Sequence, residues 1–256
     1  MTRILDIVSA KGGVGKTTTV ANLGAALVSK FNKEVVILDF NFSASNLALS
    51  MGLYNTPVTI NHVLSGHSLL SEAIYIHPSG LRIIPASLCF GDFKVDTGKL
   101  KREIKKTLGF ADFVLLDSAP GLTTEAVNSL DVCDDALIVS TPHVPSLVNS
   151  SRTFNLAKTL GVNVLGLALT RVKSKSYEYG NAEVQNIIDT PILAKIPEDD
   201  RVLASSNKGL PVVLKSPHSP ASVAYTKLAC TLLDEEYSPS LMDSAKQRFF
   251  SVLKHS

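Results

Sequence analysis

Residues 11–18 read Lys-Gly-Gly-Val-Gly-Lys-Thr-Thr, and this stretch decides the fold expected for the chain. An apolar strand pattern at residues 4–8 precedes it, and apolar residues at helical spacing follow it through residues 19–30. A phosphate chain needs several backbone N–H groups that point at one spot, which requires glycines, and a lysine that neutralises its oxygens. The succession of strand, glycine-rich loop and helix therefore predicts a phosphate-binding loop, or P-loop.

The predicted P-loop supplies the chemical groups that a nucleotide phosphate requires. Lys16 would neutralise the β- and γ-phosphate oxygens, and Thr17 would offer its hydroxyl to Mg²⁺. The general pattern begins with a glycine where this chain has Ala10. The residues expected to bind the phosphates are Gly12, Gly13, Val14, Gly15, Lys16, Thr17 and Thr18.

A second lysine, Lys11, opens the loop. From that side of the loop it cannot easily reach a γ-phosphate bound by its own P-loop, but it can reach one bound by a facing copy of the chain. Lys11 therefore suggests an ATP-dependent homodimer with nucleotide between the subunits.

The rest of the chain alternates short apolar runs with helix-like segments. Strands are expected at residues 35–38, 81–85, 113–116, 136–139, 164–169 and 192–194, and helices at 99–108, 124–130, 146–160, 182–188 and 221–233. This alternation is typical of βαβ units. We expect one α/β P-loop NTPase domain at residues 1–233, with a mostly parallel central sheet flanked by helices, and then a charged, Pro-containing linker at 234–239.

Composition excludes several function classes. The 25 Lys and Arg against 23 Asp and Glu leave a formal charge of +2, so bulk electrostatics do not favour wrapping nucleic acid. The chain begins without a basic segment and apolar run, and no apolar stretch reaches the roughly 20 residues of a spanning helix, so we expect a cytoplasmic protein. Neither the cysteines, Cys89, Cys133 and Cys230, nor the six histidines show metal-site spacing.

The loop together with two later segments resembles the deviant Walker A ATPases, with the MinD and ParA branch, and archaeal MinD-like proteins in particular, matching best. The resemblance extends through Leu233 and implies ATP, ADP and Mg²⁺ as ligands. Residues 115–121, Leu-Leu-Asp-Ser-Ala-Pro-Gly, resemble the second switch, in which Asp117 would hold the Mg²⁺ shell through water. Residues 36–47 resemble the first switch, with Asp39 near the metal and Asn46 in an Asn-Leu pair.

The first switch departs from the family at one position. Asn41 stands where relatives usually carry an aspartate that is thought to orient or activate the attacking water. A carboxamide accepts a hydrogen bond through its oxygen but does not take up a proton at neutral pH. We therefore place Asn41 among the catalytic residues with Lys11, Lys16 and Asp117, and expect ATP hydrolysis to be slow or to use another group.

Residues 196–201, Ile-Pro-Glu-Asp-Asp-Arg, resemble the loop that lies along adenine in MinD-like proteins. The resemblance implies that Pro197, Glu198 and Asp199 contact the base, although a polar helix cap explains the same residues. Relatives have an Asn-Arg pair at a second base-contacting site, where this chain has Thr170 and Arg171. Arg171 can stack or pair, whereas a threonine lacks the paired donor and acceptor of a carboxamide.

The segment at residues 240–256 has a different character. On a helical wheel one face is apolar, and cations flank or oppose it; the face carries Leu241, Met242, Ala245, Phe249, Val252 and Leu253. A helix of this kind binds anionic membranes, as it does at the end of MinD proteins, and dimerisation would strengthen a weak single anchor. A helix docked on the domain and a coiled-coil face remain alternatives.

The preferred function is a MinD-like ATPase that binds the inner face of the membrane in its ATP state and positions other machinery with an unidentified protein partner. The alternative is a ParA-like partition ATPase whose ATP dimer binds DNA non-specifically, with the basic run at residues 99–106 as its candidate surface. A cluster-carrying relative would need bridging cysteines, and an ordinary P-loop kinase would leave Lys11 unexplained.

Overall fold

A computed structural model describes residues 2–88 and 96–238. Its strands form one sheet in the order β3-β4-β2-β5-β1-β6-β7-β8, parallel except for the antiparallel β3–β4 pair at one edge. The strands are β1 (Arg3–Val8), β2 (Val35–Phe40), β3 (Tyr75–Ile76), β4 (Arg82–Ile84), β5 (Phe113–Ser118), β6 (Asp135–Ser140), β7 (Asn163–Val172) and β8 (Ile192–Pro197). The predicted mostly parallel α/β sheet is confirmed.

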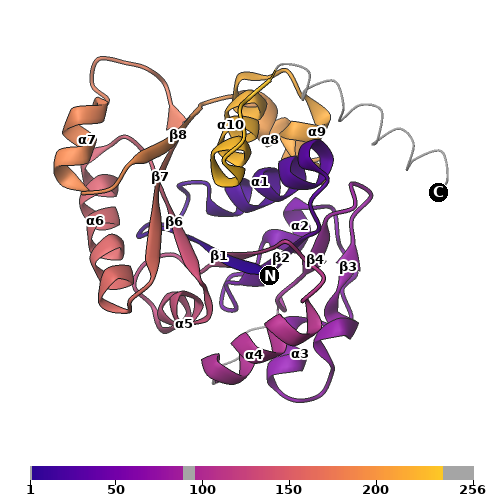
Figure 1. Cartoon of the computed structure of the whole chain (residues 1–256). Helices are drawn as coiled ribbons and strands as arrows, with labels where there is room; N and C mark the ends of the chain where they lie inside the picture. The colour runs from indigo at the N-terminus through magenta and orange to yellow at the C-terminus, as the bar shows by residue number, and fades with distance from the viewer. Residues whose placement is uncertain (1, 89–95, 239–256) are drawn as a thin grey trace.

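Helices cover both faces of this sheet (Figure 1). One face packs against α1 (Lys16–Phe31), α2 (Leu47–Ser50), α9 (Val212–Lys215) and α10 (Pro220–Leu233), and α8 (Asp200–Ser206) lies beside α9. The other face packs against α3 (Ile60–Leu64), η1 (Leu70–Ala73), α4 (Thr97–Thr107), α5 (Thr124–Val132), α6 (Val144–Thr159) and α7 (Asn181–Ile187). Alternate residues of each strand enter the two cores.

Each strand and helix that the sequence pattern predicts is present, and begins and ends close to the predicted residues. The structure adds β3, α2, α3, η1, α8 and α9, which no pattern predicted. These elements have two to seven residues, and such short segments display a helical or strand period weakly. Within the described ranges, no helix combines the length and apolarity needed to span a membrane.

The end of the described chain packs back on α10. The backbone N–H of Glu235 donates to the carbonyl of Cys230 at 2.9 Å, and the ammonium of Lys227 lies 5.1 Å from the ring centroid of Tyr237. Cys133 and Cys230 are buried. Cys89 and the amphipathic segment at residues 240–256 lie outside the described residues.

Candidate functional site

The predicted P-loop connects β1 to α1 at the carboxyl edge of the sheet. Gly13 and Gly15 have φ angles of 78° and 97°, a left-handed conformation that side chains with a Cβ adopt at a cost. Gly15 is also the N-cap residue of α1, so the first backbone N–H groups of α1 point into the loop. The geometry is that of an anion-binding loop at a helix N-terminus.

The two lysines of the loop differ in environment. Lys16 is 8% exposed, and burial lowers the pKa of its ammonium against the opposing attraction of Asp117 and then Asp6. Lys11 is exposed, and its ammonium forms no ion pair with any residue in the described parts of the chain. Lys16 is therefore held inside the loop, while Lys11 can meet a charge from outside.

Asp39 and Asp117 lie directly opposite each other on the neighbouring strands β2 and β5. Both are buried, and both belong to the sheet face that carries α1. Burial raises the pKa of both carboxyl groups; for Asp117 the repulsion from Asp39 adds to this, and a hydrogen bond with Thr17 opposes it. Two close carboxyl groups with raised pKa values are the arrangement that a cation stabilises.

The donor set around this pair fits a magnesium ion. Asp117 Oδ1 is buried without a hydrogen-bond partner in the described residues. The Thr17 hydroxyl lies close enough to Asp117 to lower its pKa. Oxygen ligands of this kind are those that Mg²⁺ prefers. Thr17, Asp39 and Asp117 are therefore brought together as the sequence predicted.

The first switch is ordered around Asp39. One carboxylate oxygen accepts from Ser45 Oγ at 2.7 Å and from the backbone N–H of Leu47 at 3.3 Å, and the other accepts from the backbone N–H of Asn41 at 3.0 Å. Sequence reasoning missed Ser45, although it lies within the switch segment. The bond from its backbone N–H to Asp39 keeps Asn41 next to the pair of aspartates.

The Asn41 side chain has one bound end and one free end. Its Nδ2 donates to the carbonyl of Ala44 at 2.9 Å, while its Oδ1 is buried without a partner in the described residues. A buried carbonyl oxygen without a donor is costly, so the site favours a donor that comes with the ligand, such as water. Asn41 can accept a hydrogen bond from such a water but cannot take its proton.

The second switch lies against the P-loop. The backbone N–H of Gly121 donates to the carbonyl of Ser9 at 2.9 Å, and a Cβ on Gly12 would lie 4.0 Å from Pro120 Cβ. Ser43 of the first switch donates to Glu125 Oε2 of α5 at 3.2 Å. The second switch therefore contacts the P-loop and the strand end before it, and the first switch contacts helix α5, which follows the second switch.

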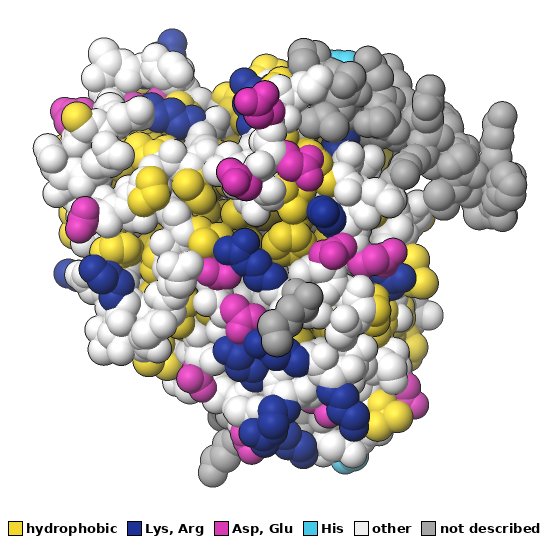
Figure 2. Space-filling model, viewed as in Figure 1, with side chains coloured by type: hydrophobic (Ala, Val, Ile, Leu, Met, Phe, Trp, Pro, Cys, Tyr) yellow, Lys and Arg dark blue, Asp and Glu magenta, His cyan; other side chains and the backbone are white. Residues whose placement is uncertain are grey.

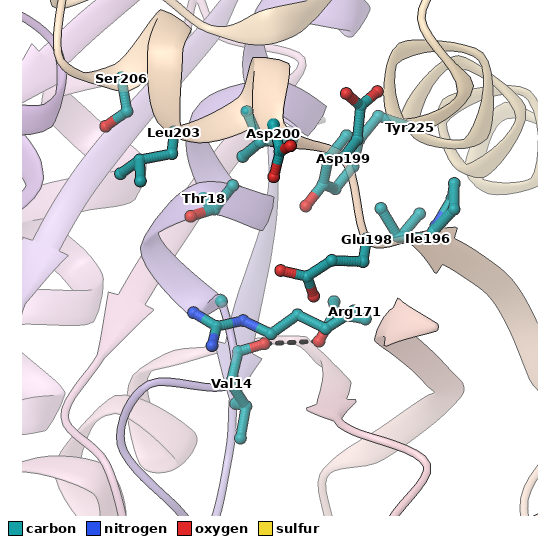
Figure 3. A pocket seen from close by; sticks show the side chains of 14 residues that line it. Val14, Thr18, Arg171, Ile196, Glu198, Asp199, Asp200, Leu203, Ser206 and Tyr225 are labelled. Atoms are coloured by element: carbon teal, nitrogen blue, oxygen red, sulfur yellow. Dashed lines mark hydrogen bonds between the residues drawn. The ribbon is translucent and has the colours of Figure 1, made fainter. Parts of the chain in front are cut away.

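A cavity of about 320 Å³ opens beside the P-loop. The predicted base-contacting residues Arg171, Pro197, Glu198 and Asp199 all line it, together with Val14, Gly15 and Thr18 of the P-loop (Figure 3). Its walls also include Ile196 of the predicted adenine loop, and Val202, Leu203 and Tyr225. Sequence reasoning missed these last three because α8 is short and Tyr225 fits an ordinary core position of α10. The cavity has the size and position of a base and ribose site.

Comparisons with known proteins agree with this geometry. Residues 5–212 match the CobQ/CobB/MinD/ParA nucleotide binding domain. An uncharacterised ATP-binding protein of Methanocaldococcus jannaschii is 33% identical over 248 residues, which cover 96% of this chain and 93% of the relative.

The solved structures that are similar to this one include two MinD proteins. The cell division ATPase MinD of Pyrococcus furiosus has a TM-score of 0.84 and 31% identity, covering 91% of this chain and 99% of that chain. The septum site-determining protein MinD of Pyrococcus horikoshii, complexed with Mg-ADP, has a TM-score of 0.83 and 32% identity, covering 96% of this chain and 100% of that chain. The chain, whose P-loop and paired aspartates lie within the matched segment, therefore belongs to the CobQ/CobB/MinD/ParA family of nucleotide-binding proteins.

Proposed function

We propose that this protein is a MinD-like ATPase switch that dimerises with ATP, binds membrane reversibly through residues 240–256, and positions other cellular machinery while hydrolysing ATP slowly. The observation that carries the proposal is the register pairing of Asp39 with Asp117 beside the P-loop. That pairing gives the loop a place for a metal ion and two switch segments that can respond to the γ-phosphate.

Different residues of the site would bind the phosphates, hold the metal ion and orient the attacking water. The P-loop N–H groups and Lys16 bind the phosphates, and Thr17, Asp117 and, through the metal shell, Asp39 would hold Mg²⁺, which neutralises charge on the β- and γ-phosphates. Asn41 Oδ1 orients the attacking water by accepting its hydrogen bond. The MinD protein of P. horikoshii forms a complex with Mg-ADP, which supports the ligands proposed for this chain.

A dimer face at the carboxyl edge of the sheet supports the two-subunit model. Lys11 is exposed there, and Leu122, which follows the second switch, is 50% exposed next to Gly121, whose backbone N–H donates to Ser9. Val144 and Val148 share a face of α6 and are also exposed. Exposed apolar side chains around an exposed lysine suit a protein interface closed by nucleotide.

Slow hydrolysis is tested by restoring a carboxylate at position 41. Asn41→Asp is expected to hydrolyse ATP about 10- to 100-fold faster than the unchanged protein, because an aspartate accepts the proton of the water that Asn41 only orients. Phosphate release is measured with purified protein and Mg²⁺, without membrane or partner. Asn41→Ala is the matched control and should show no gain. An unchanged protein that is as fast as Asn41→Asp would disprove this part of the proposal.

A ParA-like DNA-binding role is the second candidate, and helix α4 is the observation that favours it. Lys99, Arg102 and Lys106 are exposed on one side of α4. Figure 2 shows basic side chains gathered in the lower region of the molecule, where Figure 1 places α4. Lys101 and Lys105 instead contact Asp134 across the fold, at 3.4 and 2.9 Å. Three exposed cations support only weak DNA binding. A salt-sensitive DNA shift that requires ATP would favour this role over membrane binding.

A further inference from the structure

A carboxylate outside the proposed metal site contacts the first switch. Glu125 is half-buried in the first turn of α5, and its Oε2 accepts a hydrogen bond from the Ser43 hydroxyl at 3.2 Å. Asp39 also accepts hydrogen bonds from this switch, but it is buried opposite Asp117. Glu125 forms no ion pair within the described residues. It is therefore a carboxylate at the switch that is committed neither to a described cation nor to the metal site.

Ser43 and Asn41 belong to the same turn of the first switch. The backbone N–H of Ala44 donates to the carbonyl of Asn41 at 3.3 Å, so residues 41–44 form a β-turn with Ser43 at its third position. The carboxamides of Asn41 and Asn46 both donate to the Ala44 carbonyl at 2.9 Å, which fixes the end of this turn. The Ser43 hydroxyl therefore shares a short, fixed turn with Asn41 Oδ1, the buried acceptor proposed above to orient the water.

The Ser43 hydroxyl connects water to the Glu125 carboxylate. A hydroxyl group donates one hydrogen and accepts others, and the hydrogen of Ser43 is given to Glu125. The Ser43 lone pairs therefore remain for a donor such as water, and the Ser43 side chain is exposed to it. Asn41 can accept a hydrogen bond from that water but cannot take its proton at neutral pH. Water, Ser43 and Glu125 together supply the proton route that Asn41 lacks.

Helix α5 also joins Glu125 to the second switch. The helix begins at Thr124, three residues after Gly121, whose backbone N–H donates to the Ser9 carbonyl in front of the P-loop. The bond from Ser43 to Glu125 thus links the first switch to the helix that continues the second. The two segments that would respond to the γ-phosphate are therefore the ones that position this carboxylate.

We propose that Glu125 is the proton acceptor for ATP hydrolysis and acts through the Ser43 hydroxyl. The water oxygen forms a bond to the γ-phosphorus as the bond from that phosphorus to the leaving oxygen of ADP breaks. The water gives a proton to Ser43 Oγ, and Ser43 passes its own hydrogen to Glu125 Oε2. The hydroxyl is thereby restored, and the carboxylic acid formed at Glu125 later releases its proton to solvent. The inference rests on the proposed function, because it requires ATP and a water at Asn41.

The test measures kcat and KM for ATP with Mg²⁺ in the full chain, for the unchanged protein, Glu125→Gln and Ser43→Ala. Glutamine keeps an oxygen that accepts the Ser43 hydrogen bond but takes up no proton, whereas alanine at position 43 removes the relay and keeps the Glu125 carboxylate. Each variant should lose at least about tenfold in kcat, with KM unchanged within about twofold. A Glu125→Gln protein as fast as the unchanged protein would overturn the inference.

Glu103→Gln is the matched control for the loss of a carboxylate. Glu103 is half-buried on α4 and accepts from the Thr107 hydroxyl at 3.1 Å, as Glu125 does from Ser43, but it contacts neither switch in the described structure. The Glu103→Gln protein should therefore keep the kcat of the unchanged protein. A loss equal to that of Glu125→Gln would contradict the proposal, because a general effect on the fold would then explain both.

A second background separates proton transfer from a structural role. Asn41→Asp places a carboxylate at the water, so Glu125→Gln should cost less than about twofold in kcat in that background. Equal losses in the two backgrounds would show that Glu125 only supports the switch, and would overturn the inference. ATP binding by calorimetry keeps the two failures apart. A chain that binds no ATP overturns the proposed function as well, whereas a chain that hydrolyses ATP equally without the Glu125 carboxylate overturns the inference alone.

Discussion

Asp6 lies in the middle of β1 with a fully buried carboxyl group. Neither oxygen has a hydrogen-bond partner in the described residues, although the Ser129 and Ser118 hydroxyls are near enough to lower the pKa. Burial outweighs them and raises the pKa of Asp6 from 3.8 to about 7. Strand alternation places Asp6 on the sheet face opposite Asp117, so it takes no part in the proposed chemistry. The buried Asp6 carboxyl group therefore lowers the free energy of unfolding near neutral pH.

The raised pKa of Asp6 predicts how the stability of the protein depends on pH. The native state holds the Asp6 proton more tightly than the unfolded chain, so stability falls as pH rises from about 4 to about 7 and is flat above. Asp6→Asn should remove this loss, on the order of 4 kcal/mol. Urea denaturation of both proteins at several pH values measures it. Asp39 and Asp117 titrate in both proteins, and Asp6→Asn removes only the smallest of the effects that raise the pKa of Asp117, so a pH-independent difference would contradict the assignment.

At the scale of elements, a close backbone contact joins the first switch to the base cavity. The turn after α2 meets the turn after α8, and a Cβ on Gly209 would lie 2.5 Å from Gly52 Cα. His77 reinforces the contact, because Nδ1 accepts from the backbone N–H of Ser79 and Nε2 therefore donates to the Gly209 carbonyl at 3.3 Å. Helix α2 follows the first switch and α8 lines the cavity, so this contact ties the two together.

Substitution at this contact has a matched control. Gly209 and Gly66 have similar φ angles, 67° and 75°, but a Cβ on Gly66 would meet no atom within 4 Å. Gly66→Ala should therefore lose only about 1 kcal/mol from the left-handed conformation. Gly209→Ala should lose about 1–3 kcal/mol more because backbone atoms must move. Chemical denaturation of the two variants decides the matter, and equal losses would show that the contact is not tight.

At the scale of the whole molecule, the proposed output combines a dimer with a tail. The described chain ends at residue 238 just after α10, near the fastening of Tyr237 to Lys227. A single short amphipathic helix binds membrane weakly, and two on one dimer bind with higher avidity. Nucleotide would therefore control membrane binding without any new contact between the tail and the lipid.

Deletion of residues 240–256 distinguishes ATP-dependent dimerisation from membrane binding by the tail. The shortened protein should still dimerise with ATP, because Lys11 and the switches are intact, but should no longer sediment with anionic vesicles. Size-exclusion chromatography with light scattering, in ATP, ADP and no nucleotide, measures the first property and vesicle sedimentation the second. Lys11→Ala in the full chain is the converse control, with nucleotide binding kept and dimerisation lost. Vesicle binding retained after the deletion would disprove the role of the tail.

The sequence by itself determined the features that contiguous residues encode. The P-loop, the strand before it and the helix after it follow from glycines, a lysine and apolar periodicity within residues 4–30, and the parallel α/β class follows from the same alternation repeated along the chain. Asp39 and Asp117 were identified through the resemblance of residues 36–47 and 115–121 to the two switch segments of the family. The sequence also shows Asp6 inside an apolar run, but not that both of its oxygens lack partners among the described residues.

Only the tertiary structure decided which distant groups meet. Strands β2 and β5 are neighbours although β3 and β4 lie between them in the chain, and their register alone places Asp39 against Asp117. The same holds for Thr170, whose hydroxyl turns to Val14 rather than to the cavity, and for Gly209 against Gly52. These contacts depend on strand order and on packing between segments far apart in sequence, and local periodicity carries no information about either.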